Sequence, residues 1–365
     1  MRSIKIEPAE LGLCDKAQSF LQSGFWGSFK ARFGWNARAF LVDWGMFGVT
    51  PLMLIRRRLG PGISFAYVPW GPELPLDFPQ TNEDRNAALA ELALGLRCFL
   101  PRDTAFIRFD PPWYTEGADM PRPLIGKPFS RAGADVQPPD TVIVDLSPTA
   151  EAILAAMKPK WRYNIHYGPK KGVTVRRVDA AQGEWTADGL EAFYSLLKET
   201  AKRDGIAIHG IEYYQGLFTQ AQEYAGAGAL VPELRLYLAE HSTEGSTEVL
   251  AAIVVLVRGR DAVYLYGASS SRNRNLMAPY ALQWKAMEDA KASGCTNYDL
   301  FGIPPNGDPS HPMAGLYLFK TGFGGRIIHR PGSWDYAYRP LLKGLFTAAE
   351  GLRKKLKDLK KNRKN

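Results

Sequence analysis

Short runs of apolar residues, broken by Gly or Pro, dominate the first half of the chain. Residues 38–46, 50–58 and 63–71 are rich in β-branched and aromatic residues, which predicts three meandering strands. Residues 81–99 place leucines at helical spacing behind a threonine or asparagine cap and predict a helix. A further strand is predicted over residues 104–110.

The same order of elements recurs in the second half. Residues 233–241, 249–259 and 262–270 predict strands, and residues 279–293 predict a helix that leads to a strand over 296–302. Strand, strand, strand, helix, strand occurring twice indicates a duplicated α/β unit. We therefore predict two tandem acetyltransferase-like (GNAT) domains, each with a mixed, mainly antiparallel sheet flanked by helices.

Helical candidates precede each meander, at residues 15–33 in the first half and at 147–157 and 188–203 in the second. A loop-like segment, 117–139, is rich in Pro and Gly and leads into a further apolar run. We place the domain boundary near Ser147, so that residues 1–146 begin the first domain.

Size and composition set limits on the class of protein. A chain of 365 residues fits two ordinary domains, and no stretch offers the roughly 20 apolar residues of a membrane span. No secretory signal is visible, so we expect a soluble, cytoplasmic protein. The three cysteines are isolated and odd in number, which predicts reduced thiols. We expect no metal and no cofactor, because neither metal-type spacings nor nucleophile motifs occur.

The net charge of +9 is concentrated in the tail, RKKLKDLKKNRKN, over residues 353–365. A basic protein favours polyanions such as nucleic acid, anionic lipid headgroups or phosphate-bearing substrates. The tail is equally well described as a solvated helix end, so its charge alone leaves its role open.

A lysine stands between an aromatic residue and a double glycine in LFKTGFGG, where we expect an active-site strand and turn. Acyl transfer from an activated ester to an amine needs a positioned amine and a stabilised oxyanion. Lys320 would serve beside the carbonyl, Phe319 would exclude water, and Gly322, Gly324 and Gly325 would allow close approach of substrate. Spacing alone also fits an exposed lysine at a strand end.

Two further segments mix basic and aromatic residues. Lys30 and Arg32 lie in GSFKARFGW. They could bind a phosphate and stack on a ring, or they could form the solvent-exposed basic face of an amphipathic helix. The segment KPKWRYNIHYGPKKG, over residues 158–172, has the interleaving that binds single-stranded nucleic acid. Its alternative is a basic surface helix whose Trp161 and Ile165 contact the core.

These three segments together resemble the Fem family of peptidoglycan-bridge aminoacyltransferases, which move amino acids from charged tRNA onto the cell-wall stem peptide. The resemblance spans nearly the whole chain. It implies a catalytic pair at Phe319 and Lys320 through the FK-x-x-F-G-G pattern, and it implies that Lys30 holds a phosphate of the muropeptide. It also implies a second phosphate contact at Arg203, although an arginine at a helix end commonly satisfies carbonyl groups instead.

The remaining site candidates are weaker. Asp110, at a predicted strand end, could orient or deprotonate the attacking amine, although a carboxylate is a weak base for an ammonium. Tyr266 and Tyr280 could line the amino-acid or peptide pocket. Trp70 occupies the turn YVPWGPEL, where the resemblance implies a basic contact, and we count it among the substrate-binding candidates. For tRNA, the candidates are Lys158, Lys160, Trp161 and Arg162.

The resemblance also implies that residues from about 321 to 365 return to the first domain, which leaves 147–320 as the second. We expect the first domain to bind the acceptor muropeptide and the second to take aminoacyl-tRNA. The residues 211–229 are too short and glycine-rich for the coiled-coil arm of some members, so the compact type is predicted.

The function predicted is aminoacyl-tRNA-dependent transfer of an amino acid to the side-chain amine of UDP-MurNAc-pentapeptide or lipid II. We expect a monomer that contacts, at most peripherally, the inner face of the plasma membrane. Two rival interpretations remain: an N-acyltransferase that uses acyl-CoA and shares the fold, and a non-enzymatic protein that binds RNA or a membrane surface.

Overall fold

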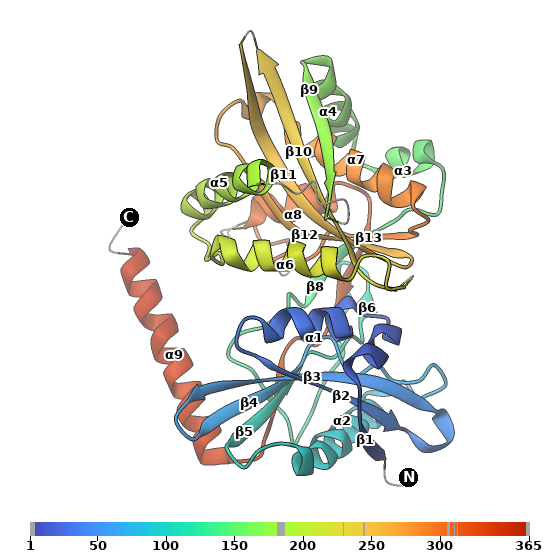
Figure 1. The fold of residues 1–365 in the computed structure, drawn as a ribbon, viewed down its shortest axis with the longest axis vertical. Coiled ribbons are helices and arrows are strands. Elements are labelled where there is room, and N and C mark those ends of the chain that lie inside the picture. Colours follow the sequence, from blue (N-terminus) through green and yellow to red (C-terminus); the bar gives the residue numbers. More distant parts are fainter. Residues whose placement is uncertain are drawn as a thin grey trace. The chain divides into compact units, whose positions relative to one another are not determined.

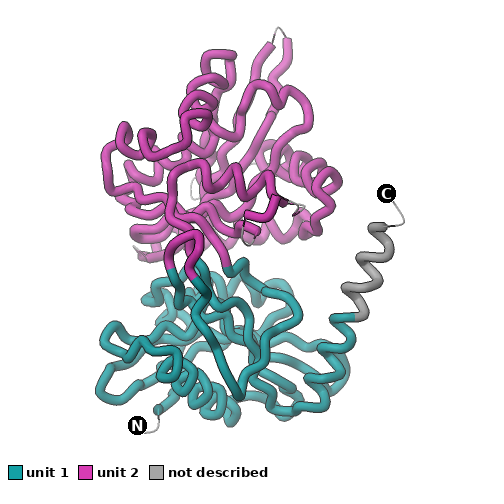
Figure 2. The backbone as a smooth tube through the Cα atoms, turned by 180° about the vertical axis from the view of Figure 1, so that it is seen from behind, with its two compact units in different colours: residues 1–115, 121–139, 329–365 teal, residues 116–120, 140–328 magenta. Residues whose placement is uncertain are grey.

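The computed structural model describes residues 4–180, 187–228, 230–243, 245–304, 307–309, 311 and 313–362, with the side chains of the last helix described as far as residue 351. The chain forms two compact units (Figure 2). Unit 1 consists of residues 1–115, 121–139 and 329–365, and unit 2 consists of residues 116–120 and 140–328. Each unit is built around one sheet.

Unit 1 contains a seven-stranded sheet whose strand order is β1-β2-β3-β4-β5-β15-β7. Neighbouring strands are antiparallel except β4 and β5, which are parallel. The strands are β1 (Lys5–Ala9), β2 (Asn36–Asp43), β3 (Val49–Gly60), β4 (Ile63–Val68), β5 (Thr104–Phe109), β7 (Ser130–Arg131) and β15 (Trp334–Ala337).

The helix α2 (Asn82–Leu96) makes the crossover between the parallel strands of unit 1. Its N-terminus is capped by Thr81, whose hydroxyl accepts a hydrogen bond from the Asp84 amide at 3.1 Å. The buried leucines of α2 pack in one core with apolar residues of β2–β5. Unit 1 also contains α1 (Gly24–Ala31), α9 (Pro340–Asn362) and the short 3₁₀ turns η1 (Leu11–Lys16), η2 (Phe20–Gln22), η3 (Gly45–Phe47) and η4 (Arg97–Phe99).

Unit 2 contains an eight-stranded sheet in the order β6-β14-β8-β13-β12-β11-β10-β9, in which β12 and β13 are parallel. Neighbouring strands from β9 to β12 are antiparallel. The strands are β6 (Thr115–Glu116), β8 (Asp140–Asp145), β9 (Val173–Asp179), β10 (Glu233–Thr243), β11 (Ser246–Arg258), β12 (Asp261–Ser269), β13 (Asn297–Asp299) and β14 (Arg326–His329).

Helices cover both faces of the unit 2 sheet (Figure 1). α4 and α7 pack together on one face, and α5 and α6 pack together on the other. The helices are α3 (Ala150–Ala156), α4 (Pro159–Lys170), α5 (Ala187–Asp204), α6 (Ile211–Glu223), α7 (Ala278–Ala292) and α8 (Ala314–Thr321), with η6 (Arg274–Leu276) before α7. Within the described part of the chain, no helix is both long enough and apolar enough to cross a membrane.

The repeated order of elements is confirmed. β2, β3 and β4 are followed by α2 and β5 in unit 1, and β10, β11 and β12 are followed by α7 and β13 in unit 2. In both units the strand after the helix lies parallel to the third strand of the meander. The chain therefore has the predicted α/β class, with two tandem units of acetyltransferase-like strand order.

The domain boundaries differ from the predicted ones. The strand β8 was assigned to the first domain, but it pairs with β13 in the sheet of unit 2. Residues 321–328, which include most of β14, also belong to unit 2 rather than unit 1. The sequence could not show this, because the partner of β8 comes some 150 residues later and strand pairing is not visible in a local pattern.

Candidate functional site

Lys320 lies in the last turn of α8, so the predicted active-site strand is wrong at this point. Its side chain is buried, with 6% of the residue exposed, which also excludes an exposed lysine at a strand end. The Nζ atom donates hydrogen bonds to the carbonyl oxygens of Phe301, at 3.1 Å, and Gly302, at 2.8 Å. It also lies 5.1 Å from the ring centre of Tyr264, on β12. A buried ammonium group is thus held beside the end of β13.

Burial lowers the pKa of Lys320 from 10.5 to about 7, and the nearby carboxylate of Asp299 opposes this shift. Asp299 ends β13, and its Oδ1 accepts hydrogen bonds from the Phe301 amide, at 2.7 Å, and from the Thr141 hydroxyl. Phe301 has a φ of 57°, which a bulky residue rarely adopts. Asp299 therefore holds the turn whose carbonyl groups bind Lys320, and no motif in the sequence points to this residue.

Aromatic side chains surround the residue before Lys320. The Phe319 ring lies 5.2 Å from that of Tyr280, on α7, and 5.2 Å from that of Phe323, both edge to face. Trp161, on α4, donates from Nε1 to the Phe319 carbonyl at 2.9 Å and packs against Tyr280. Phe319 and Tyr280, both predicted site residues, therefore pack together, and Phe319 directly precedes Lys320 in the chain.

The glycines after Lys320 meet the protein's own elements rather than an open space. A Cβ atom on Gly322 would lie 2.1 Å from the Trp161 ring, and one on Gly324 would lie 2.5 Å from the Ala156 carbonyl oxygen. A Cβ atom on Gly325 would lie 2.6 Å from Val142. The expectation that these glycines admit substrate is wrong, because they allow close packing of the segment against α3, α4 and β8.

The four tRNA candidates separate into two kinds. Trp161 contacts the core, as in the alternative stated above, and Arg162 donates to the carbonyl oxygens of Ala155, at 3.2 Å, and Met157. These two side chains hold the end of α3 and the start of α4. Lys158 and Lys160 are exposed at the start of α4, and the Lys158 Nζ lies 5.7 Å from the ring centre of Trp161.

In unit 1, Lys30 lies at the end of α1 among three aromatic rings. Its Nζ is 5.7 Å from the ring centre of Trp26 and 5.9 Å from those of Phe29 and Trp35. Burial, and secondly the charge of Arg57, lowers the pKa of Lys30 from 10.5 to about 8. The Arg57 guanidinium lies 5.5 Å from the same Trp35 ring. Two like charges share this ring, and an anion would relieve their repulsion.

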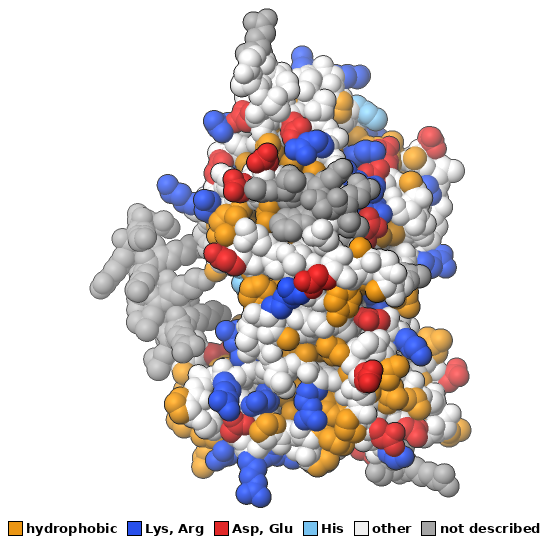
Figure 3. All heavy atoms as spheres, viewed as in Figure 1, with side chains coloured by type: hydrophobic (Ala, Val, Ile, Leu, Met, Phe, Trp, Pro, Cys, Tyr) orange, Lys and Arg blue, Asp and Glu red, His pale blue; other side chains and the backbone are white. Residues whose placement is uncertain are grey.

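Figure 3 shows basic side chains gathered over the part of unit 1 in which β3 and β4 lie. Arg57 and Arg58 on β3 are exposed there. Arg57 was not among the predicted site residues, although the three consecutive arginines at residues 56–58 are a signal in the sequence. This surface attracts anions at the end of the Lys30 helix.

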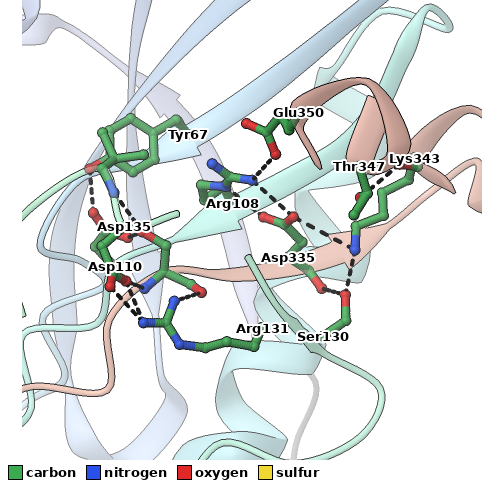
Figure 4. Close-up of polar contacts among 12 residues, drawn as sticks. Tyr67, Arg108, Asp110, Ser130, Arg131, Asp135, Asp335, Lys343, Thr347 and Glu350 are labelled. Atoms are coloured by element: carbon green, nitrogen blue, oxygen red, sulfur yellow. Dashed lines mark hydrogen bonds and ion pairs between the residues drawn. The ribbon is translucent and has the colours of Figure 1, made fainter. Parts of the chain in front are cut away.

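Asp110 follows β5 and is buried, with 2% of the residue exposed. Its carboxylate accepts hydrogen bonds from the hydroxyls of Tyr67, at 2.5 Å, and Ser333, and from the Gln137 amide at 3.1 Å (Figure 4). Burial raises the pKa of Asp110 to about 6, and these hydrogen bonds oppose the shift. The carboxylate thus links three segments of unit 1 by hydrogen bonds. The prediction that it points into a cleft is wrong, because its partners enclose it.

Trp70 follows β4 and has a φ of 40°. The guanidinium of Arg330 lies 4.1 Å from the centre of its ring. A basic group is therefore present at this turn, although it comes from the far end of the chain instead of from the turn itself. Local sequence gave no signal for this contact.

Arg203 and Tyr266 have partners within unit 2. Arg203 donates to the Ser269 carbonyl at 2.9 Å and forms an ion pair with Asp204, which matches the helix-end alternative. Tyr266 packs edge to face on Tyr214 of α6, with ring centres 5.2 Å apart. Arg203 belongs to unit 2 and Lys30 to unit 1.

Known proteins resemble this chain over most of its length. The model of the FemAB family matches residues 124–226 and 232–351. The chain is 23% identical over 397 residues to the lipid II:glycine glycyltransferase of Staphylococcus saprophyticus subsp. saprophyticus, covering 92% of this chain and 91% of that protein. It is 23% identical over 381 residues to the lipid II:glycine glycyltransferase of Staphylococcus aureus (strain COL), covering 87% of each.

A crystal structure of FemX aligns with 94% of this chain and 100% of its own, with a TM-score of 0.72 and 18% sequence identity. This likeness shows a common fold. The family model covers more than half of the residues and includes both Lys320 and the crossover helix of unit 2. The chain therefore belongs to the FemAB family.

Proposed function

We propose that this chain transfers an amino acid from aminoacyl-tRNA to the side-chain amine of a peptidoglycan stem peptide carried by UDP-MurNAc or lipid II. Membership of the FemAB family and the similarity to two lipid II:glycine glycyltransferases support an aminoacyltransferase that builds peptidoglycan bridges. The observation that carries the proposal is the buried, hydrogen-bonded ammonium group of Lys320 beside the end of β13. We expect the reaction in the cytoplasm or at the inner face of the plasma membrane.

The chemistry requires the acceptor amine to attack the ester carbonyl of the aminoacyl group. A C–N bond forms between the neutral amine and the carbonyl carbon, and the carbonyl oxygen becomes an oxyanion. When the oxyanion collapses, the C–O bond to the tRNA ribose breaks, the amine nitrogen loses one proton and the ribose oxygen takes up one proton. An ammonium group has three N–H bonds, and the carbonyls of Phe301 and Gly302 accept two from Lys320. The third would be donated to the oxyanion. The ester supplies the leaving group, so no covalent enzyme intermediate is needed.

The ionisation of Lys320 suits this role. A pKa of about 7 leaves roughly half of the side chains charged at neutral pH. The carbonyl oxygens around Nζ favour the charged form, which donates, and burial keeps competing water away. Phe319 and Tyr280 form an aromatic wall beside this group. Asp299 is a positioning residue, because it accepts a hydrogen bond from the Phe301 amide and so holds the turn whose carbonyl group binds Lys320.

Unit 1 is proposed to bind the acceptor. Lys30, with Arg57 on the other side of Trp35, would hold the acceptor's phosphates, and Trp70 with Arg330 would contact its sugar or peptide. Arg203 keeps its proposed phosphate role only if substrate displaces its bond to Ser269. Lys158 and Lys160 are the exposed cations proposed to meet the tRNA backbone. Asp110 would hold the wall of the acceptor site instead of taking a proton.

The test is mass spectrometry of UDP-MurNAc-pentapeptide and of lipid II after incubation with the purified chain and a fully aminoacylated tRNA pool. A mass gain of one amino-acid residue that disappears after RNase treatment is expected. A parallel reaction with acetyl-CoA and no tRNA distinguishes the rival N-acyltransferase. Transfer from acetyl-CoA alone, or no gain on either acceptor from a folded preparation, would overturn the proposal.

A further inference from the structure

The inner face of the C-terminal helix α9 is fastened to the sheet of unit 1 by buried charges. Arg108, on β5, binds Asp335, on β15, with Nε and Oδ1 2.7 Å apart and both side chains at most 5% exposed. Lys343 of α9 lies 3.8 Å from Asp335 and donates to the Ser130 hydroxyl at 2.7 Å. Glu350 of α9 lies 3.9 Å from Arg108. Figure 4 shows these side chains converging on Asp335 and Arg108.

An aromatic contact fastens the same face. Phe346 lies between Lys343 and Glu350 on α9, and its ring packs on Phe65 of β4 and Phe106 of β5, with centre distances of 6.4 and 5.2 Å. Residues 343, 346 and 350 follow the helical period, so they define one face of α9. The opposite face must therefore point away from the sheet.

That outer face is apolar. Leu341 is 87% exposed, Leu345 is 68% exposed and Ala348 is also exposed. We call Leu341, Leu345 and Ala348 the outer stripe. In the sequence, leucines continue at the same spacing at positions 352, 356 and 359. Exposed leucines at helical spacing on a surface helix indicate an interaction surface.

The C-terminal sequence that carries the outer stripe is strongly basic. Residues 340–365 contain nine Lys and Arg (343, 353, 354, 355, 357, 360, 361, 363 and 364) against two acidic residues (350 and 358), a net charge of +7 within the chain's total of +9. A helix that combines an apolar face with many Lys and Arg residues has the composition of helices that lie in the interface of an anionic membrane. A second copy of α9 would instead bring like charges together.

We propose that α9 docks on an anionic lipid surface, with the outer stripe inserted among the acyl chains and the basic residues against the headgroups. Nucleic acid would match the charge but would leave the leucines in water, so the lipid surface fits both features. The buried ion pairs hold the helix while its outer face binds. This inference does not rest on the transferase activity, and it is tested without substrates.

The test uses the full chain and co-sedimentation with vesicles of phosphatidylcholine alone or mixed with phosphatidylglycerol. The double variant Leu341→Glu/Leu345→Glu places carboxylates in the outer stripe. Leu76→Glu is the matched control, because Leu76 is 89% exposed in unit 1 but lies outside α9. Thermal unfolding by circular dichroism checks that each variant remains folded, which is expected because these leucines are exposed.

The unmodified chain and Leu76→Glu are expected to bind phosphatidylglycerol vesicles and not pure phosphatidylcholine, and the double variant is expected to bind at least about tenfold more weakly. Failure to bind anionic vesicles would overturn the proposal, as would equal binding by both variants. Light scattering tests whether a second copy of the chain binds the outer stripe. A filter-binding assay with non-aminoacylated tRNA tests whether nucleic acid binds it. A dimer, or tRNA binding, that is lost in the double variant while vesicle binding persists would assign the stripe to that partner instead.

Discussion

Replacing Lys320 with Met removes the ammonium group and keeps an unbranched side chain of similar length. If Lys320 donates to the oxyanion, the loss should resemble that of an oxyanion-hole donor, about 10²- to 10³-fold in kcat, or about 3 to 4 kcal/mol. The acceptor and tRNA surfaces are unchanged, so KM should change little. The assay is the initial rate of amino-acid transfer, and Lys202→Met, an exposed lysine on α5, serves as the control.

The stability of Lys320→Met shows whether a loss of activity comes from the missing ammonium group or from unfolding. The lowered pKa, from 10.5 to about 7, means that folding disfavours the charged form by about 5 kcal/mol. Met avoids this cost but leaves the carbonyls of Phe301 and Gly302 without their donor, at about 1 to 3 kcal/mol each. These effects nearly cancel, so the variant should remain folded at pH 7.

The sign of the pH dependence follows from proton binding. Between pH 7 and 10.5 the unfolded lysine binds more protons than the folded one, so the unmodified protein gains stability as pH rises. From pH 7 to about 9.5 its free energy of unfolding should rise by about 3 kcal/mol relative to Lys320→Met. Urea titrations at the two pH values measure this. A transfer rate of Lys320→Met within threefold of that of the unmodified protein would refute the catalytic assignment. If the difference in free energy of unfolding between the two proteins is the same at both pH values, the lowered pKa of Lys320 would be refuted.

Three further predictions concern unit 1. Lys30→Met should raise KM for the phosphate-bearing acceptor about tenfold with little change in kcat, whereas Arg102→Met, at an exposed arginine, should leave steady-state kinetics unchanged. Asp335→Asn breaks a buried ion pair and should lower the free energy of unfolding, measured by urea titration, by about 3 to 5 kcal/mol. The control Glu116→Gln breaks an exposed ion pair in unit 2 and should change the free energy of unfolding by less than about 1 kcal/mol. Burial raises the pKa of Asp110 from 3.8 to about 6, so the free energy of unfolding should fall by about 2 kcal/mol between pH 4 and 7, and Asp110→Asn should abolish that slope. A slope that persists in Asp110→Asn would contradict the assignment, as would an unaltered KM in Lys30→Met or equal effects of the two ion-pair variants.

Local pattern predicted the meanders well because alternating apolar residues and turn-forming glycines act over a few residues. All three strands of each meander, the crossover helix and the following strand occur where the sequence indicated them. The same kind of signal failed at α8. Aromatic residues beside glycines resembled a strand and turn, yet Leu316, Phe319 and Lys320 follow a helical period, and burial against α4 and α7 decides the outcome.

Motifs in the sequence identified several candidate site residues, but only the structure shows which groups surround each of them. Lys320 and Phe319 were found from a motif, but the pKa shift of Lys320 depends on burial and on Asp299, which lies 21 residues earlier in the chain. Asp110 was expected to face a cleft, and the hydroxyls of Tyr67 and Ser333 instead enclose its carboxylate. Such partners come together only in the folded unit.

The sequence by itself determined the α/β class, the duplicated order of elements, the basic C-terminal helix and the lysine next to an aromatic residue near the chain's end. Those properties depend on periodicity, composition and motif, which are local. Tertiary structure decided which strands pair, where each unit ends, which lysines lose their water and which face of α9 stays exposed. Each of these depends on contacts between residues far apart in the chain, and the free energy of such contacts cannot be assigned until the fold brings the residues together.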